Sequence, residues 1–418
     1  MPAALSQRFG GLRRLASAEP GRHGAQPPWR RLGAVAAAGF ALGCLFLLLQ
    51  LLRLDAVSLQ PAHLELTAPF QVGTGWRLDE ALAARGIPAR ITPGHGYDGQ
   101  WFLGLAYDPL LRGGVASGFD MPRYRAGRPL HAMAGWLLAG GRSRAIPAAL
   151  LLVGPLALAL GAAANGRLLA AFGRSRWWGL GFALVPGVAV GVIFGTAEPL
   201  GLALAVLGLS LALEGRWPAA GTAFAGAGLT KESYLVFAGA AALWLLLWSG
   251  RPLRARLAPA ALLVGPGVVA LGLWWAYVAR MVPGSAADAN AVEAVGAPLA
   301  GWKETLLLAA RGGYVPDFPV GPSGVLMLVG SLGLALAGVA LGLRRRGPLD
   351  HSGLWLGLYG LVLSGALLGH FLSAMRALAP TVLAAGLAVL AALPARRPAP
   401  AATGGRGARQ AEARPTGS

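Results

Sequence analysis

The chain has 418 residues, of which 55% are hydrophobic and only 13% are charged, and its mean hydropathy is +0.57. This charged fraction is about half that of ordinary soluble domains, which excludes a water-soluble globular fold and a disordered chain. The one cysteine, Cys44, excludes an internal disulfide framework. The composition therefore predicts an integral membrane protein.

The net charge is +19, from 36 Lys and Arg against 17 Asp and Glu, and in a soluble chain it would favour nucleic-acid binding. Here nearly all the basic residues are Arg, and they cluster at the ends of apolar runs. Charges in that position set the orientation of membrane helices, because basic loops stay in the cytoplasm. We therefore expect membrane lipids and no nucleic acid as partners. The preference for Arg, Ala and Gly is typical of a bacterial genome rich in GC.

In chain order, the sequence predicts a basic tail, a membrane anchor, one long outer loop, a helical bundle and a second basic tail. The run 32–52 is about 20 residues long, enough to span a ~30 Å hydrocarbon core, and no small-x-small cleavage site follows it. We expect a signal anchor there. The expected divisions are a cytoplasmic tail at 1–31, the anchor at 32–52, the outer loop at 53–144, the bundle at 145–395 with an outer loop at 280–320, and a cytoplasmic tail at 396–418.

Nine further apolar runs follow the anchor, which predicts an all-α membrane protein with about ten transmembrane helices. Pro129–Gly141 is an exception, because its 13 residues reach only about 20 Å as a helix. If this segment lies along the membrane interface, most Lys and Arg fall on the cytoplasmic side and most acids outside, as the positive-inside rule requires. Both termini are then cytoplasmic. The runs lie at 145–166, 177–195, 197–213, 217–230, 234–249, 257–279, 323–343, 353–373 and 377–394.

The outer loop contains the densest group of candidate site residues, in the segment Tyr97–Pro109. The apolar residues 101–106 predict a short helix lying against the membrane surface, with Asp98 at its start. One interpretation is that Asp98 caps this helix and that Asp108, before Pro109, caps another. Capping and catalysis are compatible, because a helix start also holds a carboxylate rigidly.

Three arginines, Arg123, Arg125 and Arg128, lie within six residues, just before the interfacial segment. Guanidinium groups at the outer lipid boundary suit a phosphate head group. The alternative is that their side chains only snorkel to the interface. His131, one turn further on, is expected to be a packing residue.

Two short outer turns carry charge between apolar helices: Glu198 precedes Pro199, and Lys231 and Glu232 follow Thr230. These residues either belong to the site or only cap helices and mark the membrane boundary. A phosphate loop is excluded because Thr230, not Gly, stands before Lys231. The sequence has no dinucleotide fingerprint, no zinc spacing and no Ser-His-Asp signature.

These motifs resemble a bacterial family, the C-type (GT-C) polytopic membrane glycosyltransferases that use polyprenyl-phosphate sugars, and in particular its cell-surface glycopolymer formation proteins. The resemblance covers roughly residues 95–250. It rests on Tyr97-Asp98-Gly99-Gln100-Trp101-Phe102, Asp108-Pro109, Arg123-Tyr124-Arg125, Arg128-Pro129-Leu130, Thr196-Ala197-Glu198-Pro199-Leu200 and Ala227-Gly228-Leu229-Thr230-Lys231-Glu232.

The resemblance implies a GT-C-like fold and an inverting hexosyl transfer on the outer face of the bacterial inner membrane. Asp98 matches the family's general base, and the donor is a polyprenyl-phosphate-linked sugar. The acceptor is a cell-surface glycan or lipid. The family often pairs a second acid closely with the first, whereas Asp108 lies ten residues on. We therefore expect no cofactor, and the residues give no support for a divalent metal.

The remaining candidates divide by role. The second acid is Asp108 or Glu198, and the lipid phosphate is bound by Arg123, Arg125 and Arg128. Substrate contacts are expected from Tyr97, Gln100, Trp101, Tyr124, Lys231 and Glu232. Two other functions stay open: a transporter or flippase for a lipid-linked glycopolymer, and a non-catalytic assembly factor. A transporter predicts broken or charged helices near the bilayer midplane.

Overall fold

A computed structural model describes residues 28–58, 66–285, 296–311, 322–368 and 371–394, apart from residues 76, 85 and 88. The predicted tails lie outside the described residues, except for residues 28–31. Of the predicted outer loop at 280–320, Asp288, Glu293 and Asp317 lie outside them as well.

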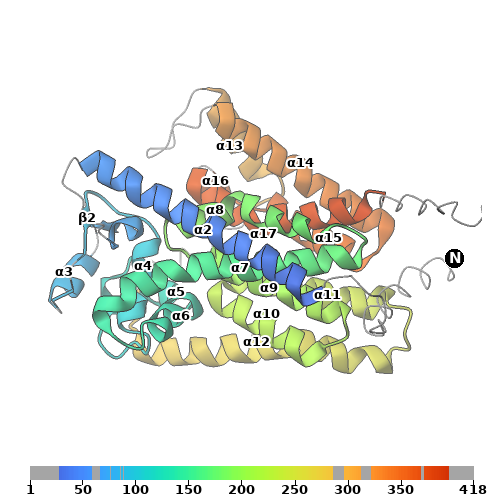
Figure 1. Cartoon of the computed structure of the whole chain (residues 1–418), viewed down its shortest axis with the longest axis horizontal. Helices are drawn as coiled ribbons and strands as arrows, with labels where there is room; N and C mark the ends of the chain where they lie inside the picture. Colours follow the sequence, from blue (N-terminus) through green and yellow to red (C-terminus); the bar gives the residue numbers. More distant parts are fainter. Residues whose placement is uncertain are drawn as a thin grey trace, which may run out of the picture.

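The described chain is mostly helical, as the composition predicts (Figure 1). The long helices are α2 (Pro28–Ser58), α7 (Ile146–Ala171), α9 (Glu198–Leu213), α10 (Trp217–Thr230), α11 (Leu235–Trp248), α12 (Arg254–Met281), α14 (Pro322–Arg345), α15 (Pro348–Leu361) and α17 (Phe371–Ala392). The short ones are α3 (Leu78–Ala83), α4 (Gly99–Tyr107), α5 (Pro122–Ala126), α6 (Leu130–Leu138), α8 (Pro186–Ile193), α13 (Ala300–Ala310) and α16 (Gly365–Leu368).

Short 3₁₀ turns and one minimal sheet complete the structure. The strands β1 (Val72–Gly73) and β2 (Ile91–Thr92) pair in parallel through two residues each. The 3₁₀ turns are η1 (Ala68–Phe70), η2 (Val115–Gly118), η3 (Ser143–Ala145), η4 (Arg176–Leu184) and η5 (Glu232–Tyr234).

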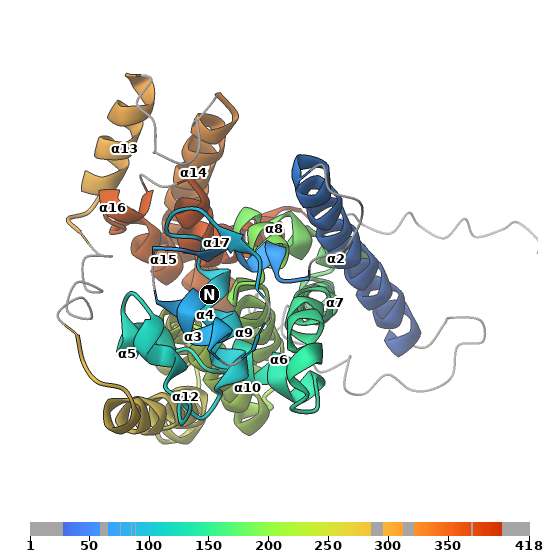
Figure 2. The ribbon, with the colours of Figure 1, turned by 90° about the vertical axis from the view of Figure 1, so that its left-hand side faces the viewer.

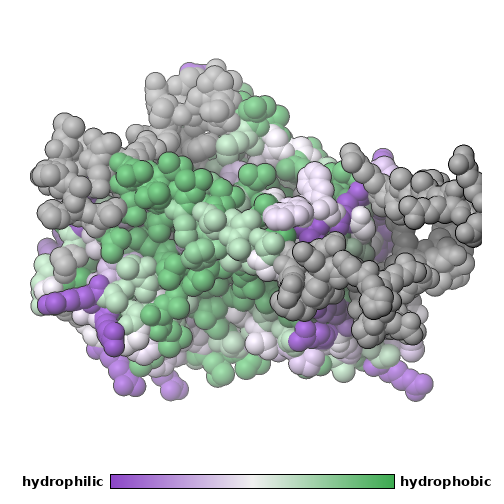
Figure 3. Space-filling view, viewed as in Figure 1, coloured by the Kyte–Doolittle hydropathy of each residue, from purple (hydrophilic) through white to green (hydrophobic). Residues whose placement is uncertain are grey.

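Five helices of the described chain are long and apolar enough to cross a membrane, and a sixth span is possible if η4 and α8 form one segment bent by 65°. The five are parts of α2, α7, α12, α14 and α17. Apolar side chains form a broad surface between polar ends (Figure 3). These helices indicate a membrane-embedded protein.

The number of spans expected from the ten apolar runs is not confirmed. Helices α9, α10 and α11 have 16, 14 and 14 residues, which correspond to about 21–24 Å and fall short of a ~30 Å core. The run 353–373 is divided among α15, α16 and the start of α17. The runs at 197–213, 217–230 and 234–249 predicted the positions of α9, α10 and α11, but these helices are shorter than a full membrane span.

Glycines allow close packing between helices, as α2 and α7 illustrate. An added Cβ at Gly43 would lie 2.7 Å from Pro155 Cα, and one at Gly39 would lie 2.9 Å from the carbonyl oxygen of Leu158. Contacts this short exclude a side chain, because membrane helices that approach closely need small residues at the interface.

The described residues of the predicted outer loop from 66 onward gather at one end of the bundle, where α3, α4 and α5 lie together (Figure 1 and Figure 2). The core of this region is formed by α4, whose Trp101 and Leu103 are buried against α6, α7 and η2. The short helix at residues 101–106 is thus confirmed, but its expected place was wrong. It is enclosed by protein instead of lying on the membrane surface. Helix α6 has nine residues, about 14 Å, which agrees with the prediction that this segment does not span.

Candidate functional site

Eight ionisable side chains, here called the network, gather where the predicted outer loop meets the bundle. Six of them are linked by ion pairs, and the separate pair Arg128–Glu232 interacts with them by charge without a direct ion pair. The four acids and four bases of the network balance in charge, and they come from segments that are far apart in the sequence. The acids are Asp98, Asp120, Glu198 and Glu232, and the bases are Arg125, Arg128, Lys231 and Arg376.

Asp98 directly precedes α4 and lies between two guanidinium groups. Its Oδ2 accepts a hydrogen bond from Arg376 Nη1 at 2.7 Å, and its Oδ1 lies 3.2 Å from Arg125 Nη1. The side chain caps no backbone N–H, so the capping interpretation was wrong. Burial acts to raise the pKa of Asp98, but the positive charges of Arg125 and Arg376 outweigh it and hold the pKa well below its ordinary value. The Asp98 side chain is 29% exposed, and its lowered pKa keeps the carboxylate ionised near neutral pH.

Arg376 is the residue that connects the two halves of the network. It lies in α17, is 5% exposed, and its Nη2 reaches Glu198 Oε1 at 2.8 Å while its Nη1 holds Asp98. Sequence reasoning missed it, because the apolar runs 353–373 and 377–394 placed it in a short outer turn. A single Arg within an otherwise apolar helix was the available signal, since such residues are costly in a membrane and usually functional.

Glu198 is buried at the first turn of α9. Thr196 Oγ1 donates a hydrogen bond to Glu198 Oε2 at 2.5 Å, and Lys231 Nζ lies 3.5 Å from Oε1. The carboxylate does not cap the helix by a side-chain hydrogen bond, so this capping interpretation was also wrong. A negative charge in the first turn is nevertheless favourable beside the helix N-terminus.

The three sequence-predicted arginines do not share one site. Arg123 donates through Nε to the carbonyl oxygen of Val282 at 2.9 Å, and through Nη2 to that of Ala279 at 3.3 Å, at the end of α12. Arg125 lies on the opposite face of α5, because residues two apart in a helix point in different directions. The three arginines therefore do not converge on one position, and only Arg125 and Arg128 belong to the network.

Both remaining arginines hold a carboxylate through two hydrogen bonds. Arg125 Nε and Nη2 donate to Asp120 at 2.9 and 2.8 Å. Arg128 Nε and Nη2 donate to Glu232 at 3.0 and 2.6 Å. The guanidinium carbon of Arg128 also lies 4.2 Å from the ring centre of Tyr124, and its Nη2 donates to the Tyr124 hydroxyl.

Aromatic rings surround the network. The ring of Tyr97 packs at a tilt against that of Phe194, with ring centres 4.8 Å apart, and its centre lies 5.4 Å from the guanidinium carbon of Arg376. The ring centre of Trp101 lies 5.5 Å from the guanidinium carbon of Arg125. Burial raises the pKa of Tyr97 to about 12, so its hydroxyl stays neutral. The rings therefore face the cations of the site, at distances typical of cation–π contacts.

Three other sequence candidates lie outside the network. Asp108 follows α4 and accepts hydrogen bonds from the backbone N–H groups of Arg112, Gly113 and Val115; no helix begins at Pro109, so the predicted cap was wrong. Gln100 joins Gly73 to His95 through its side-chain amide. His131 is buried against Phe102, as expected of a packing residue.

Gly99 allows the segment that holds Asp98 to approach the bundle. An added Cβ would lie 2.1 Å from the carbonyl oxygen of Phe194 and 3.2 Å from Phe70 Cα, both backbone atoms. We expect Gly99→Ala to destabilise the protein by about 1–3 kcal/mol through overpacking. Thermal unfolding in detergent measures this. Gly239→Ala is the control, since no atom lies within 4 Å of its added Cβ; equal melting temperatures for the two variants would contradict the prediction.

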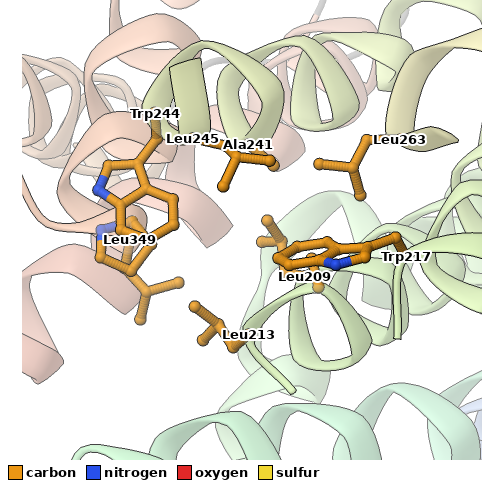
Figure 4. Close-up of a pocket in the computed structure, with 10 residues that line it drawn as sticks. Leu209, Leu213, Trp217, Ala241, Trp244, Leu245, Leu263 and Leu349 are labelled. Carbon is orange, nitrogen blue, oxygen red and sulfur yellow. The ribbon is translucent and has the colours of Figure 1, made fainter. Parts of the chain in front are cut away.

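In the described part of the chain, no group of three or more His, Cys, Asp or Glu side chains is arranged to hold a metal ion. A small apolar cavity of about 20 Å³ lies at the far end of α9 from Glu198 (Figure 4). Trp217, Trp244 and Leu349 are among its lining residues, and it contains no charged side chain. The network is therefore the candidate site.

No family model matches this chain, and neither a curated protein nor a solved structure does. The fold and the composition define the class by themselves: a mostly helical chain with several apolar helices of membrane-spanning length.

Proposed function

We propose that the chain is a bacterial inner-membrane glycosyltransferase of the C-type. It moves a sugar from a polyprenyl-phosphate donor to a cell-surface glycan or lipid, on the outer face, with inversion. About ten membrane segments, some of them short, and two cytoplasmic termini complete this proposal. The observation that carries it is the partly exposed carboxylate of Asp98, fixed by two guanidinium groups beside two further cations.

The chemistry assigned to Asp98 is general-base catalysis. The acceptor hydroxyl oxygen attacks the anomeric carbon, the bond from that carbon to the phosphate oxygen breaks, and the hydroxyl proton passes to the carboxylate. A positioned base typically contributes 10²–10⁴-fold. Arg125 and Arg376 keep Asp98 ionised and hold its orientation.

The leaving group is a lipid phosphate, whose negative charge grows as the bond breaks. Arg128 and Lys231 lie at the same end of the bundle and can stabilise it, because fixed cations in a partly buried site act more strongly than in water. Tyr97 and Tyr124 are half-buried beside the cations and are the rings we assign to the sugar, whereas Trp101 is buried in the core of the loop. A donor carried by the membrane suits a site at the end of apolar helices.

The test is an assay of the purified protein with radiolabelled sugars on two kinds of carrier. A crude cell-envelope fraction supplies the acceptor. We expect transfer from a polyprenyl-phosphate sugar and none from the corresponding nucleotide sugar. Transfer from neither carrier by a folded protein would reject the enzymatic function.

Two observations favour the alternatives. All four acids of the network are paired, which is typical of a structural contact and favours a non-catalytic assembly factor. The 65° bend between η4 and α8 resembles the broken helices of transporters, which favours a flippase for a lipid-linked glycopolymer. If the protein moves a lipid-linked glycan from one leaflet of a vesicle membrane to the other and transfers no sugar, the flippase function is supported.

A further inference from the structure

Of the ion pairs of the network, Arg128–Glu232 has the largest difference in exposure between its two side chains, slightly larger than that of Arg376–Asp98. The Arg128 side chain is 7% exposed, whereas that of Glu232 is 36% exposed. A nearly buried guanidinium is therefore covered by the carboxylate that, among the four acids, is most open to solvent. Glu232 is thus the partner of this pair that faces solvent more.

Arg128 has support that does not depend on Glu232. Its guanidinium carbon lies over the ring of Tyr124 at 4.2 Å, and its Nη2 also donates to the Tyr124 hydroxyl. Tyr124 and Arg128 are four residues apart, so this contact is set within the outer loop. The guanidinium stays in place if its carboxylate partner leaves.

Glu232 has weaker local support. It is the first residue of η5, a three-residue turn between α10 and α11, and it is 104 residues from Arg128 in sequence. Its neighbour Lys231 has extended backbone and reaches Glu198 only at 3.5 Å, longer than an ordinary hydrogen bond. An anion on Arg128 would lie next to this second cation.

A carboxylate on Arg128 presents two oxygens to Nε and Nη2, at 3.0 and 2.6 Å. A phosphodiester monoanion presents two oxygens in the same way and carries the same charge, because the guanidinium fork binds both groups bidentately. Exchange of one for the other conserves two charge-assisted hydrogen bonds and the charge balance of the buried groups. The released Glu232 gains hydration, which lowers the cost of the exchange.

We propose that Arg128 is the binding site for the phosphodiester group of a lipid, and that Glu232 occupies this site until the lipid replaces it. The inference rests on the proposed function for the identity of the lipid as a polyprenyl-phosphate sugar. A phosphatidylglycerol head group has the same phosphodiester chemistry. Glu232 therefore selects against weakly bound anions, which must compete with it.

Binding to the full chain in dodecyl maltoside, measured by isothermal titration calorimetry, tests this exchange. The probe is farnesyl methyl phosphate, which carries one permanent negative charge, and farnesyl dimethyl phosphate is its neutral control. We expect Glu232→Gln to bind the anionic probe about tenfold more tightly than the wild type. The reason is that the neutral glutamine side chain no longer competes with the probe for the Arg128 guanidinium through a charged contact. Arg128→Lys should bind it about tenfold more weakly, because Lys lacks the fork.

Glu214→Gln is the matched control. It removes one carboxylate from another ion pair, in which Arg167 Nη2 lies 2.5 Å from Glu214 Oε2 at the opposite end of α9. This variant should bind like the wild type, and none of the variants should change binding of the neutral probe. Weaker or unchanged binding by Glu232→Gln would overturn the exchange, as would binding of neither probe by wild type and Glu232→Gln.

Further measurements distinguish a polyprenyl-phosphate sugar from a phospholipid head group as the ligand, and distinguish failure of the exchange from failure of the proposed transferase function. Tight binding of short-chain phosphatidylglycerol with the same response to Glu232→Gln supports the exchange with a lipid head group as its ligand. The expected pattern with farnesyl methyl phosphate, together with no sugar transfer, supports the exchange and rejects the transferase. If the protein transfers sugar and Glu232→Gln leaves the KM for the lipid donor unchanged, the proposed transferase function is supported and the exchange of Glu232 for the lipid phosphodiester is overturned.

Discussion

Replacing Arg376 by Gln is expected to lower the free energy of unfolding by about 3–5 kcal/mol. The residue is 5% exposed and holds Asp98 and Glu198 together, so its loss leaves two carboxylates without their shared cation. Removing one partner of a buried ion pair typically costs this much, because the remaining charge stays desolvated. Denaturant or thermal unfolding in detergent measures the effect.

Two variants control for this prediction. Arg167→Gln breaks the more exposed pair with Glu214 and should cost no more than about 1 kcal/mol. Adding Asp98→Asn and Glu198→Gln to Arg376→Gln removes the two carboxylates that lose this cation and should restore part of the stability. If Arg376→Gln alone is as stable as the wild type, Arg376 does not join the outer loop to the bundle.

Replacing Asp98 by Asn is expected to reduce sugar transfer by at least about 10²-fold, because an amide cannot accept the acceptor's proton. The amide is nearly the same size and still accepts a hydrogen bond from Arg376, so the protein should accumulate in the membrane. The measurement is transfer from a radiolabelled polyprenyl-phosphate sugar, together with the amount of protein in the membrane. Full complementation of a deletion strain by Asp98→Asn would reject the general-base role.

The matched control is Glu80→Gln, which removes a negative charge from the same loop, where Glu80 pairs with Arg77 in an exposed position. Its transfer rate should equal that of the wild type. Equal losses in both variants would show that the net charge of the loop matters, and not the carboxylate of Asp98.

The pH dependence follows from the direction of the Asp98 pKa, which lies well below its ordinary value in the folded protein. The base is therefore ionised throughout the range around neutrality, and no acid limb of the rate profile should come from Asp98 above about pH 4. By the same linkage, the stability that Asp98 contributes is fully present above its unfolded-state pKa and is lost as the pH falls through the folded one. An Asp98-dependent limb near pH 6 would contradict this assignment.

Local patterns in the sequence were sufficient for the helical class and for several details. Apolar runs predicted helices, the residues 101–106 predicted α4, and the length of Pro129–Gly141 predicted a helix too short to span. These properties depend on the composition and length of single segments. Asp98, Arg125, Arg128, Glu198, Lys231 and Glu232 were all selected as candidates, and the structure brings them together.

Where local reasoning failed, neighbouring segments decided the outcome. A carboxylate before a helix can cap it or bind a distant cation, and both Asp98 and Glu198 bind Arg376. The spacing of Arg123 and Arg125 places them on opposite faces of α5, so the three arginines do not form the single cluster that their order in the sequence suggested.

Composition and segment length thus determined that this chain is helical and apolar, since each helix forms its backbone hydrogen bonds within its own segment. The sequence by itself also placed most charged candidates at segment ends. Only the tertiary structure decided their partners. Arg376 meets Asp98 across 278 residues, and Arg128 meets Glu232 across 104. Buried charges require a partner, and which partner is near depends on how the helices pack.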